Sequence, residues 1–449
     1  MTTRKLQGPL GGDYQTDGVG NAVLLISYPL TADDDVPTRL ADHEARVTAA
    51  EGAQTSQGRG LLKPNVAAAQ LLPLPKLLAS PPTFTLGVAS AATAISGSVR
   101  YDVSDPAFRF FGGPTAIEGG GYRSALQAKN NGSIILEANW GMEFEFYGDK
   151  FELELGGVST SRWRMWVDNL GCDSILGQTG MATDSLGYKH LYEFSSVALR
   201  RIRFDFNAST KLLGIRLAPT HSIWAASSPI GPKVVVTGDS FAEGFNHWPK
   251  TMGWLLGWYD IQIVGKGSTG YLDTSAGSDT YRDRIQKDVL DKSPDIVIVS
   301  GGLNDNGFPA AAVQAEAVTL YQMIRNALPD AILIVSGVQY TNGTVANSSF
   351  VTTRDAIRAA ANTAYGDGTL AHLYIEQMGG PYPYSGTIGD YTNKGWMTGT
   401  GRVGATTGSG NSDLFRDTDS THPTQAGHDY RGYRHAAAIA AAMPILGAS

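Results

Sequence analysis

The chain has 449 residues, of which 42% are hydrophobic and 17% are charged, and its net charge is −7. This length favours two or three domains, and the acidic balance argues against a nucleic-acid-binding protein, which usually shows a basic surface. Cys172 is the only cysteine, which excludes an intramolecular disulfide and any zinc site built on several cysteines.

Residues 1–85 show no sustained pattern of a folded domain, and we expect them to be a spacer or an attachment segment. The start has no apolar core of a secretion signal, and no segment offers the ~20 apolar residues that cross a bilayer. Residues 38–51 form a helix candidate that is either a connector or a short stalk helix pairing with copies of itself. The prolines between residues 64 and 82 are typical of an extended spacer.

Residues 86–228 predict an antiparallel β-sandwich. Residues 142–146 (MEFEF) and 151–155 (FELEL) alternate apolar and charged side chains, and Gly148-Asp149 between them indicates a hairpin turn. Residues 162–167 and 201–206 alternate in the same way. Such strands bury one face and leave the other to solvent, so we expect the glutamates and arginines to form a solvated outer face.

Two aromatic residues of this region, Trp166 and Tyr147, fall on the outer face of their strands. Each is placed to stack on a sugar ring or to pack against a neighbouring domain. Single exposed aromatic residues are common on protein surfaces, so the pattern leaves both interpretations open.

Residues 229–449 predict an open α/β domain. Apolar runs at 234–236, 260–264, 294–302 and 331–337 lack alternation, which is typical of strands buried on both faces. Helical stretches follow at residues 310–328, 352–364 and 425–443. Strands that alternate with helices indicate a parallel sheet covered on both sides, and in such folds active groups gather at the carboxyl ends of the strands.

Four short segments fall at the ends of these predicted elements. Gly238-Asp239-Ser240 follows the first strand, residues 267–270 (GSTG) follow the second, and residues 302–305 (GLND) follow the third. Residues 419–422 (DSTH) precede the last helix. Each segment alone is a weak signal, because Asp419 also suits a helix cap and Asn304 also suits a turn. Together they predict a single site at one edge of the sheet.

The residue types in these segments suit acyl transfer. A serine hydroxyl such as that of Ser240 needs a base, and His422 is the candidate. Asp419, three residues earlier, can hold the imidazole in the required tautomer. The backbone N–H groups of Ser240 and Gly270 and the side-chain amide of Asn304 are the candidate donors to an oxyanion.

The segments GDSFAEG, STG, GLND and DSTH resemble, in order, the four motif blocks of the SGNH (GDSL-type) hydrolase superfamily. The resemblance implies a flavodoxin-like α/β fold with Ser240 as the nucleophile, His422 as the base and Asp419 as its acid partner. It also implies that Gly270 and Asn304 belong to the oxyanion hole, and it implies neither a metal nor an organic cofactor. Members of the superfamily include esterases, deacetylases, lipases and thioesterases.

A β-sandwich before an SGNH domain resembles the arrangement of two-domain carbohydrate esterases, which implies an acetylated carbohydrate as the substrate. A glycine-rich segment at residues 379–412 leads toward Asp419 and His422. Within and near it, Tyr271, Trp396 and Arg402 are the candidates for substrate binding. The competing interpretations are a lipase or thioesterase for small acyl esters, and a glycan-binding virion or adhesin protein without catalysis.

The first 85 residues also resemble the amino-terminal part of phage tail-fibre or tailspike proteins, some of which carry deacetylases. This resemblance implies an extracellular or virion-associated protein that forms a homotrimer or joins a larger assembly through this segment. We expect no nucleic-acid partner and no membrane partner.

Overall fold

A computed structural model describes three strands near the amino terminus and most residues from 78 onward. The described ranges are 5–7, 13–16, 22–25, 78–87, 92–125, 129–130, 133–134, 139–157, 160–177, 187–227, 231–274, 279–339, 348–365, 372–387 and 395–446. The chain divides into two compact units, Met1–Ala45 and Arg46–Ser449. The helix candidate at residues 38–51 lies outside the described residues.

The first unit contains an antiparallel three-stranded sheet that the sequence pattern did not predict. Its strands are β1 (Lys5–Gln7), β2 (Asp13–Thr16) and β3 (Ala22–Leu25), and they pair in chain order. No side-chain alternation marks these short strands, which is why the sequence reading placed them in a spacer.

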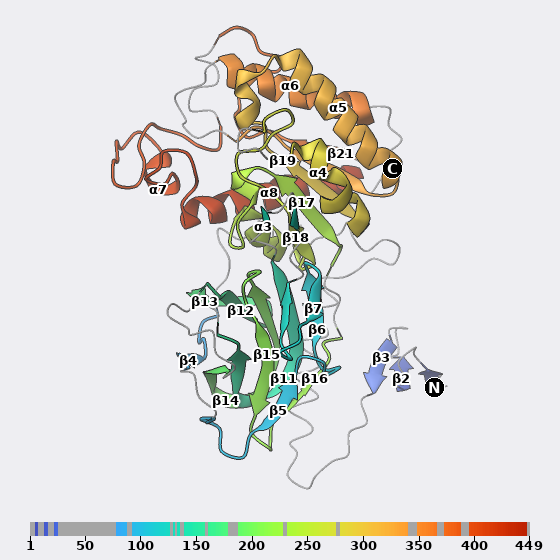
Figure 1. Cartoon of the computed structure of the whole chain (residues 1–449), viewed down its shortest axis with the longest axis vertical. Coiled ribbons are helices and arrows are strands. Elements are labelled where there is room, and N and C mark those ends of the chain that lie inside the picture. Colours follow the sequence, from blue (N-terminus) through green and yellow to red (C-terminus); the bar gives the residue numbers. More distant parts are fainter. Residues whose placement is uncertain are drawn as a thin grey trace. The chain divides into compact units, whose positions relative to one another are not determined.

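The second unit begins with the predicted antiparallel β-sandwich (Figure 1). β4 pairs with β14, so the sandwich starts slightly before the expected boundary at residue 86. Its strands are β4 (Thr83–Thr85), β5 (Val99–Asp102), β6 (Arg109–Gly112), β7 (Thr115–Ile117), β8 (Arg123–Ala125), β11 (Trp140–Leu155), β12 (Arg162–Val167), β13 (Leu170–Gly177), β14 (Tyr188–Phe206), β15 (Leu212–Leu217) and β16 (Ser222–Trp224), with a separate pair β9 (Lys129–Asn130) and β10 (Ser133–Ile134).

The expected hairpin at Gly148-Asp149 is wrong, because both alternating runs belong to the single strand β11. β11 pairs with β14 along its whole length, with Gly148 opposite Ala198 and Lys150 opposite Glu193. The register therefore shifts between Gly148 and Lys150, where the single residue Asp149 faces residues 194–197 of β14. The extra residues lie on β14, and β11 continues through Gly148, whose φ of 159° is close to fully extended backbone.

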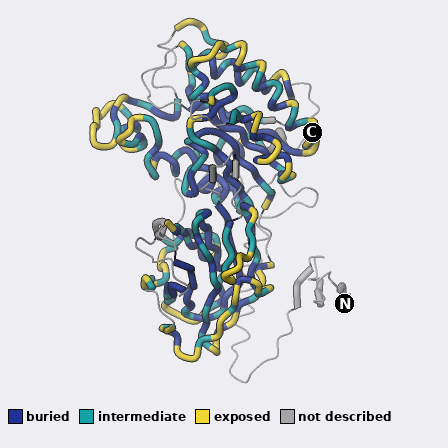
Figure 2. The backbone as a smooth tube through the Cα atoms, in the orientation of Figure 1, coloured by how far each residue is buried: buried dark blue, intermediate teal, exposed yellow. Residues whose placement is uncertain are grey.

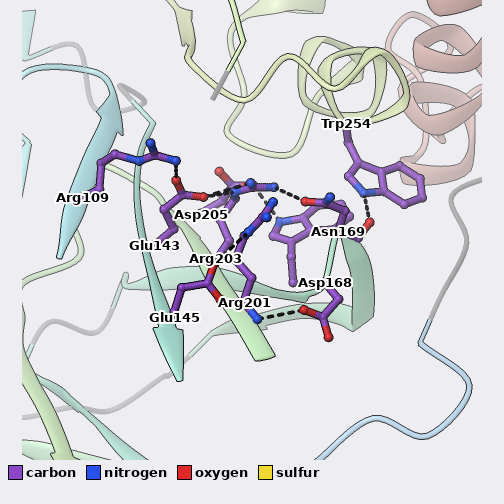
Figure 3. Close-up of polar contacts among 10 residues, drawn as sticks. Arg109, Glu143, Glu145, Asp168, Asn169, Arg201, Arg203, Asp205 and Trp254 are labelled. Carbon is purple, nitrogen blue, oxygen red and sulfur yellow. Dashed lines mark hydrogen bonds and ion pairs between the residues drawn. The ribbon is translucent and has the colours of Figure 1, made fainter. Parts of the chain in front are cut away.

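The outer glutamates and arginines do not form the solvated face that the alternation predicts. Glu143 is 0% exposed and Glu145 is 7% exposed. Glu143 pairs with Arg109 and Arg203, and Glu145 pairs with Arg201, as Figure 3 shows. Neighbouring strands and the second domain cover this face, and the buried charges neutralise one another, as buried charges must.

Trp166 lies at the junction between the sandwich and the α/β domain, as one of the two sequence interpretations expected. Its ring centroid lies 5.0 Å from that of Trp254 in the α/β domain, and its Nε1 donates to Asp205 at 2.9 Å. Asp205 also binds Lys250 across the junction, with 2.9 Å between Nζ and Oδ1. Packing against the neighbouring domain is therefore confirmed for Trp166, while sugar stacking by Tyr147 stays a prediction.

The side chain of Asn139, from the sandwich, pairs with β18 at the edge of the parallel sheet in the α/β domain. Its Nδ2 donates to the carbonyl of Ile261 at 2.8 Å, and its Oδ1 accepts from the N–H of Ile263 at 3.0 Å. Gly112 of β6 donates its N–H to Asp260 at 2.6 Å. These bonds satisfy the backbone of an edge strand, which otherwise offers a template for unwanted pairing.

Replacing Asp205 by alanine should destabilise the protein by about 3–5 kcal/mol, because Lys250 and the Nε1 of Trp166 would stay buried without their shared acceptor. Urea denaturation followed by tryptophan fluorescence measures this change. The exposed Glu118 provides the control, since Glu118→Ala should shift the free energy of unfolding by less than about 0.5 kcal/mol. Equal effects of the two substitutions would contradict the role of Asp205 at the junction.

The α/β domain contains the predicted parallel sheet, with strand order β18-β17-β19-β20-β21. This order is that of a flavodoxin-like fold. The four predicted apolar runs form β17 (Val234–Gly238), β18 (Ile261–Ile263), β19 (Ile296–Ser300) and β20 (Ile332–Ser336), and the sequence reading missed β21 (His372–Ile375). The buried strands appear dark blue at the centre of the domain in Figure 2.

Helices cover both faces of this sheet. α4 (Tyr281–Asp288), α5 (Ala310–Ala327) and α6 (Ser348–Tyr365) pack on one face, and α3 (Trp248–Leu256) and α8 (Gln425–Leu446) pack on the other (Figure 1). The predicted helices at 310–328, 352–364 and 425–443 correspond to α5, α6 and α8. Within the ranges that the structure describes, no helix is long and apolar enough to cross a membrane.

Candidate active site

Ser240 lies where the buried strand β17 ends and a short 3₁₀ helix, η1 (Ser240–Ala242), begins. A Cβ atom on Gly238 would lie 2.0 Å from the carbonyl oxygen of Ser300, so β19 leaves room only for glycine there. Asp239 caps η1 by accepting the N–H of Phe241 at 3.0 Å. Each residue of the Gly-Asp-Ser sequence therefore has a distinct part in presenting the Ser240 hydroxyl at the edge of the sheet.

His422 and Asp419 lie in the loop before α8 and form a continuous chain of contacts with Ser240. The Nε2 of His422 lies 2.8 Å from the Oγ of Ser240, and its Nδ1 lies 2.5 Å from the Oδ2 of Asp419. The other oxygen of Asp419 accepts the N–H groups of Thr421 at 2.8 Å and His422 at 2.9 Å. The structure thus brings together three residues that are up to 182 positions apart in the sequence.

The carboxyl group of Asp419 keeps its charge in this arrangement. Partial burial raises its pKa, but hydrogen bonds from the His422 side chain and from two backbone N–H groups outweigh that effect and hold the pKa at about 2. A charged Asp419 favours a proton on Nδ1 of His422, which leaves Nε2 as the acceptor that faces Ser240. This is the state in which an imidazole can take a proton from a serine hydroxyl.

Gly270 does not offer its N–H to the site, which corrects its expected place in the oxyanion hole. That N–H donates to the carbonyl of Asp273 at 3.0 Å. Gly267 borders the serine, since a Cβ atom built on it would be 3.6 Å from the Cβ of Ser240. The N–H of Gly267 donates to the Glu243 carboxylate at 2.7 Å. Several glycines follow β18, and their order in the sequence does not show which one comes closest to the serine.

Asn304 holds the same loop from the other side. It begins the 3₁₀ helix η3 (Asn304–Gly307) after β19, and its Nδ2 donates to the carbonyl of Thr269 at 2.9 Å. The amide group carries a second N–H, which this bond does not use. The neighbouring Asp305 accepts the N–H groups of Tyr271, at 2.9 Å, and Leu272, at 2.8 Å. Asp305 is the last residue of the GLND segment, and the sequence pattern predicted no role for it.

None of the three candidates for substrate binding has a side chain that is free to contact a substrate beside Ser240: two are buried, and the third bonds to the Asp419 loop. Tyr271 is 1% exposed and its hydroxyl lies 2.5 Å from that of Tyr321, and Trp396 is 7% exposed and packs against His435. Neither ring is accessible to a substrate, because Tyr271 packs in the core on one face of the sheet and Trp396 packs in the core on the other. Arg402 donates to the carbonyl of Thr418, so it supports the loop that carries Asp419.

Two further histidines pack beside the site as neutral core residues. The rings of His247 and His428 stack with their centroids 3.8 Å apart, and the Nδ1 of His247 accepts the N–H of Gly244 at 2.8 Å. Burial, together with the nearby His422, lowers the pKa of His247 to about 4. Burial also lowers the pKa of His428 well below its usual value. The loop after Ser240 is thereby held by an uncharged imidazole group.

The raised pKa of Asp239 makes the stability of the folded protein depend on pH. Burial raises its pKa to about 7 from an ordinary 3.8, and the nearby Asp305 carboxylate acts in the same direction. Its Oδ2 is buried and has no hydrogen-bond partner among the described residues. Because the folded state holds the proton more tightly, this group stabilises the fold below about pH 4, and that contribution is lost as the pH rises to about 7.

An Asp239→Asn variant should therefore lose less stability between pH 4.5 and pH 7.5 than the wild type does. The expected difference is about 2–4 kcal/mol, because asparagine cannot ionise but still accepts the N–H of Phe241. Urea denaturation of both proteins at the two pH values measures it. Identical pH dependence in the two proteins would show that Asp239 does not titrate in this range.

Comparisons with known proteins relate the α/β domain to a family and the fold to solved structures. Residues 236–430 match the model of the GDSL-like Lipase/Acylhydrolase family. The structure is similar to that of a salicylyl-acyltransferase from a tetracycline biosynthetic pathway, with a TM-score of 0.55, 12% identity and coverage of 77% of this chain and 98% of that chain. It is also similar to a family two carbohydrate esterase from Clostridium thermocellum in complex with cellohexaose, with a TM-score of 0.51, 14% identity and coverage of 76% and 99%. The sequence matches no curated protein.

Proposed function

Since residues 236–430 match the model of the GDSL-like Lipase/Acylhydrolase family, we propose that this protein is a serine esterase that removes acetyl groups from a carbohydrate. The observation that carries the proposal is the unbroken chain from Ser240 through His422 to Asp419, with contacts of 2.8 Å and 2.5 Å. In this proposal Ser240 is the nucleophile, His422 is the general base and then the general acid, and Asp419 orients the imidazole.

The first half of the reaction transfers the acetyl group to the enzyme. His422 Nε2 takes the proton from the Oγ of Ser240 as this oxygen attacks the ester carbonyl. The negative charge that develops on the carbonyl oxygen is stabilised by the N–H of Ser240 and the Nδ2 of Asn304, each such donor being typically worth about 3–4 kcal/mol. The intermediate then expels the sugar oxygen, which receives the proton from His422.

The second half releases acetate. His422 takes a proton from a water molecule, whose oxygen attacks the acetyl group on Ser240. The bond to the Oγ of Ser240 then breaks, the proton on His422 returns to that oxygen, and acetic acid leaves and loses its remaining proton to the solvent as acetate. The enzyme regains its starting state and needs no further reactant.

Two features support a carbohydrate as the substrate. A β-sandwich precedes the catalytic domain, and the same overall fold occurs in a solved carbohydrate esterase that holds cellohexaose. The side chains of His422 and Asp419 are 41% and 49% exposed, so the site lies open at the surface. An open site suits a chain of sugars better than it suits a long acyl chain, which needs an apolar tunnel.

The test is the release of acetate from a panel of acetylated polysaccharides and of chromogenic esters with acyl chains of two to twelve carbons. We expect acetate release from a polysaccharide and activity on the chromogenic esters that falls as the acyl chain lengthens. A preference for long chains would favour a lipase, and a preference for thioesters would favour a thioesterase. Binding of a glycan without any acetate release would favour the non-catalytic interpretation.

A further inference from the structure

Glu243 lies beside the proposed nucleophile but takes no part in the proposed steps. It follows η1, three residues after Ser240, and its carboxylate accepts the N–H of Gly267 at 2.7 Å. This contact places a carboxylate against the loop that borders the serine.

Gly267 lies between the carboxylate of Glu243 and the side chain of Ser240 as a neighbour of both. A Cβ atom built on Gly267 would lie 2.7 Å from the Oε2 of Glu243 and 3.6 Å from the Cβ of Ser240. The three residues are therefore mutual neighbours. The alcohol part of an ester bound at Ser240 must pass within the electrostatic reach of Glu243.

Two carboxyl groups lie at this site. Asp419 contacts His422, and the Glu243 carboxylate accepts the N–H of Gly267. Burial raises the pKa of the Glu243 carboxyl group, while the N–H of Gly267 and the nearby Arg284 act in the opposite direction. Arg284 also pairs with Asp288, with 2.9 Å between Nη1 and Oδ2. The carboxyl group of Glu243 therefore lies beside the loop that borders Ser240.

We propose that Glu243 determines specificity, so that the site accepts esters of neutral or amino-bearing sugars and rejects esters of acidic sugars. This inference rests on the proposed function and adds the charge class of the substrate to it. The carboxylate repels an anionic alcohol part and attracts a cationic one, and it does so without contacting the atoms that react.

Three acetyl esters of the same shape and different charge test the inference. Acetylcholine, 3,3-dimethylbutyl acetate and 2-acetoxyethanesulfonate each carry an acetyl group on a two-carbon linker that ends in a cationic, a neutral or an anionic group. We expect the wild type to prefer them in that order by kcat/KM at pH 8. In Glu243→Gln the ratio between the cationic and the anionic ester should fall by at least about tenfold.

The glutamine variant separates charge from hydrogen bonding, because its side-chain oxygen can still accept the N–H of Gly267. Glu243→Ala removes both, and it should show the same loss of charge preference. The ratio does not depend on the amount of folded enzyme, so a lower yield of either variant does not affect it. Asp330→Asn is the matched control, since it removes one negative charge at the opposite edge of the sheet, just before β20, and should leave the ratio unchanged.

The outcomes separate this inference from the proposed function. If the wild type hydrolyses the esters and Glu243→Gln keeps the wild-type ratio, the inference is wrong and the esterase stands. If Asp330→Asn changes the ratio as much as Glu243→Gln does, the preference comes from net charge and the inference is also wrong. Hydrolysis of none of the three esters by the wild type would overturn the proposed function and this inference with it.

Discussion

A Ser240→Ala variant is expected to lose about 10⁴-fold or more in kcat for acetyl-ester hydrolysis while keeping the wild-type fold. The alanine side chain cannot form the acyl-enzyme, and His422 then has no hydroxyl at 2.8 Å to activate. Acetate release from an acetylated polysaccharide measures the loss, and the thermal unfolding midpoint checks the fold. The small methyl group fits the same space, so no cavity and no strain accompany the change.

His422→Ala and the double variant give the control for this result. Groups that act as one unit are not additive, so His422→Ala alone should be nearly as inactive as Ser240→Ala, and the double variant should be no worse. A fluorophosphonate should label the wild type on Ser240 and leave Ser240→Ala unlabelled. Acetate release that survives in Ser240→Ala would rule out the nucleophile named here.

The Asp419→Asn variant is expected to lose about 10³–10⁴-fold in kcat. The neutral amide can donate to Nδ1 of His422, and this favours the tautomer that carries its proton on Nε2. A protonated Nε2 cannot accept the proton of the Ser240 hydroxyl. Steady-state kinetics on an acetyl ester at pH 8 measure the loss, which should appear in kcat rather than in KM.

Asp417 provides the matched control in the same loop. Its carboxylate accepts the N–H of Thr418 at 2.6 Å and the hydroxyl of Thr418 at 3.2 Å, so it also organises the loop, but these contacts are with Thr418 and not with His422. Asp417→Asn should therefore keep activity within about threefold of the wild type. If both asparagine variants lose the same activity, the role of Asp419 is to shape the loop and not to orient the imidazole.

The sandwich and the active site are connected through α3. Asp205 of β14 holds Lys250 of α3, and the neighbouring Thr251 donates from its hydroxyl to Asp429 of α8 at 2.8 Å. α8 begins at Gln425, three residues after His422. Substitutions at the junction therefore act on the elements that flank both the serine and the histidine, which gives the sandwich a part in positioning the site.

The sequence was sufficient for the α/β domain because its local patterns are unambiguous. Unbroken β-branched runs such as Val234–Val236 predict strands buried on both faces, and the structure places them at the centre of a parallel sheet. Parallel strands put all their carboxyl ends at one edge, so motifs that follow separate strands meet there. The proximity of Ser240, His422 and Asp419 was therefore predictable from their positions relative to the strands.

The sequence was not sufficient wherever the answer depends on what covers a surface. Alternation in β11 shows that Glu143 and Glu145 share a face, but only the tertiary structure shows that this face is buried and paired with arginines. Likewise, the Gly148-Asp149 pair is typical of a turn, and only the pairing with β14 shows that β11 continues through it.

The sequence alone determined the class of each domain, the order of its elements and the residues that meet at the edge of the sheet. These features depend on local periodicity and on the geometry of parallel strands. The tertiary structure decided that Gly267 borders Ser240 and that the N–H of Gly270 bonds to Asp273. It also decided that Tyr271 and Trp396 belong to the core and that Glu243 lies beside the serine. The path of a loop depends on contacts between segments far apart in the chain. Those contacts leave no periodic trace in the sequence.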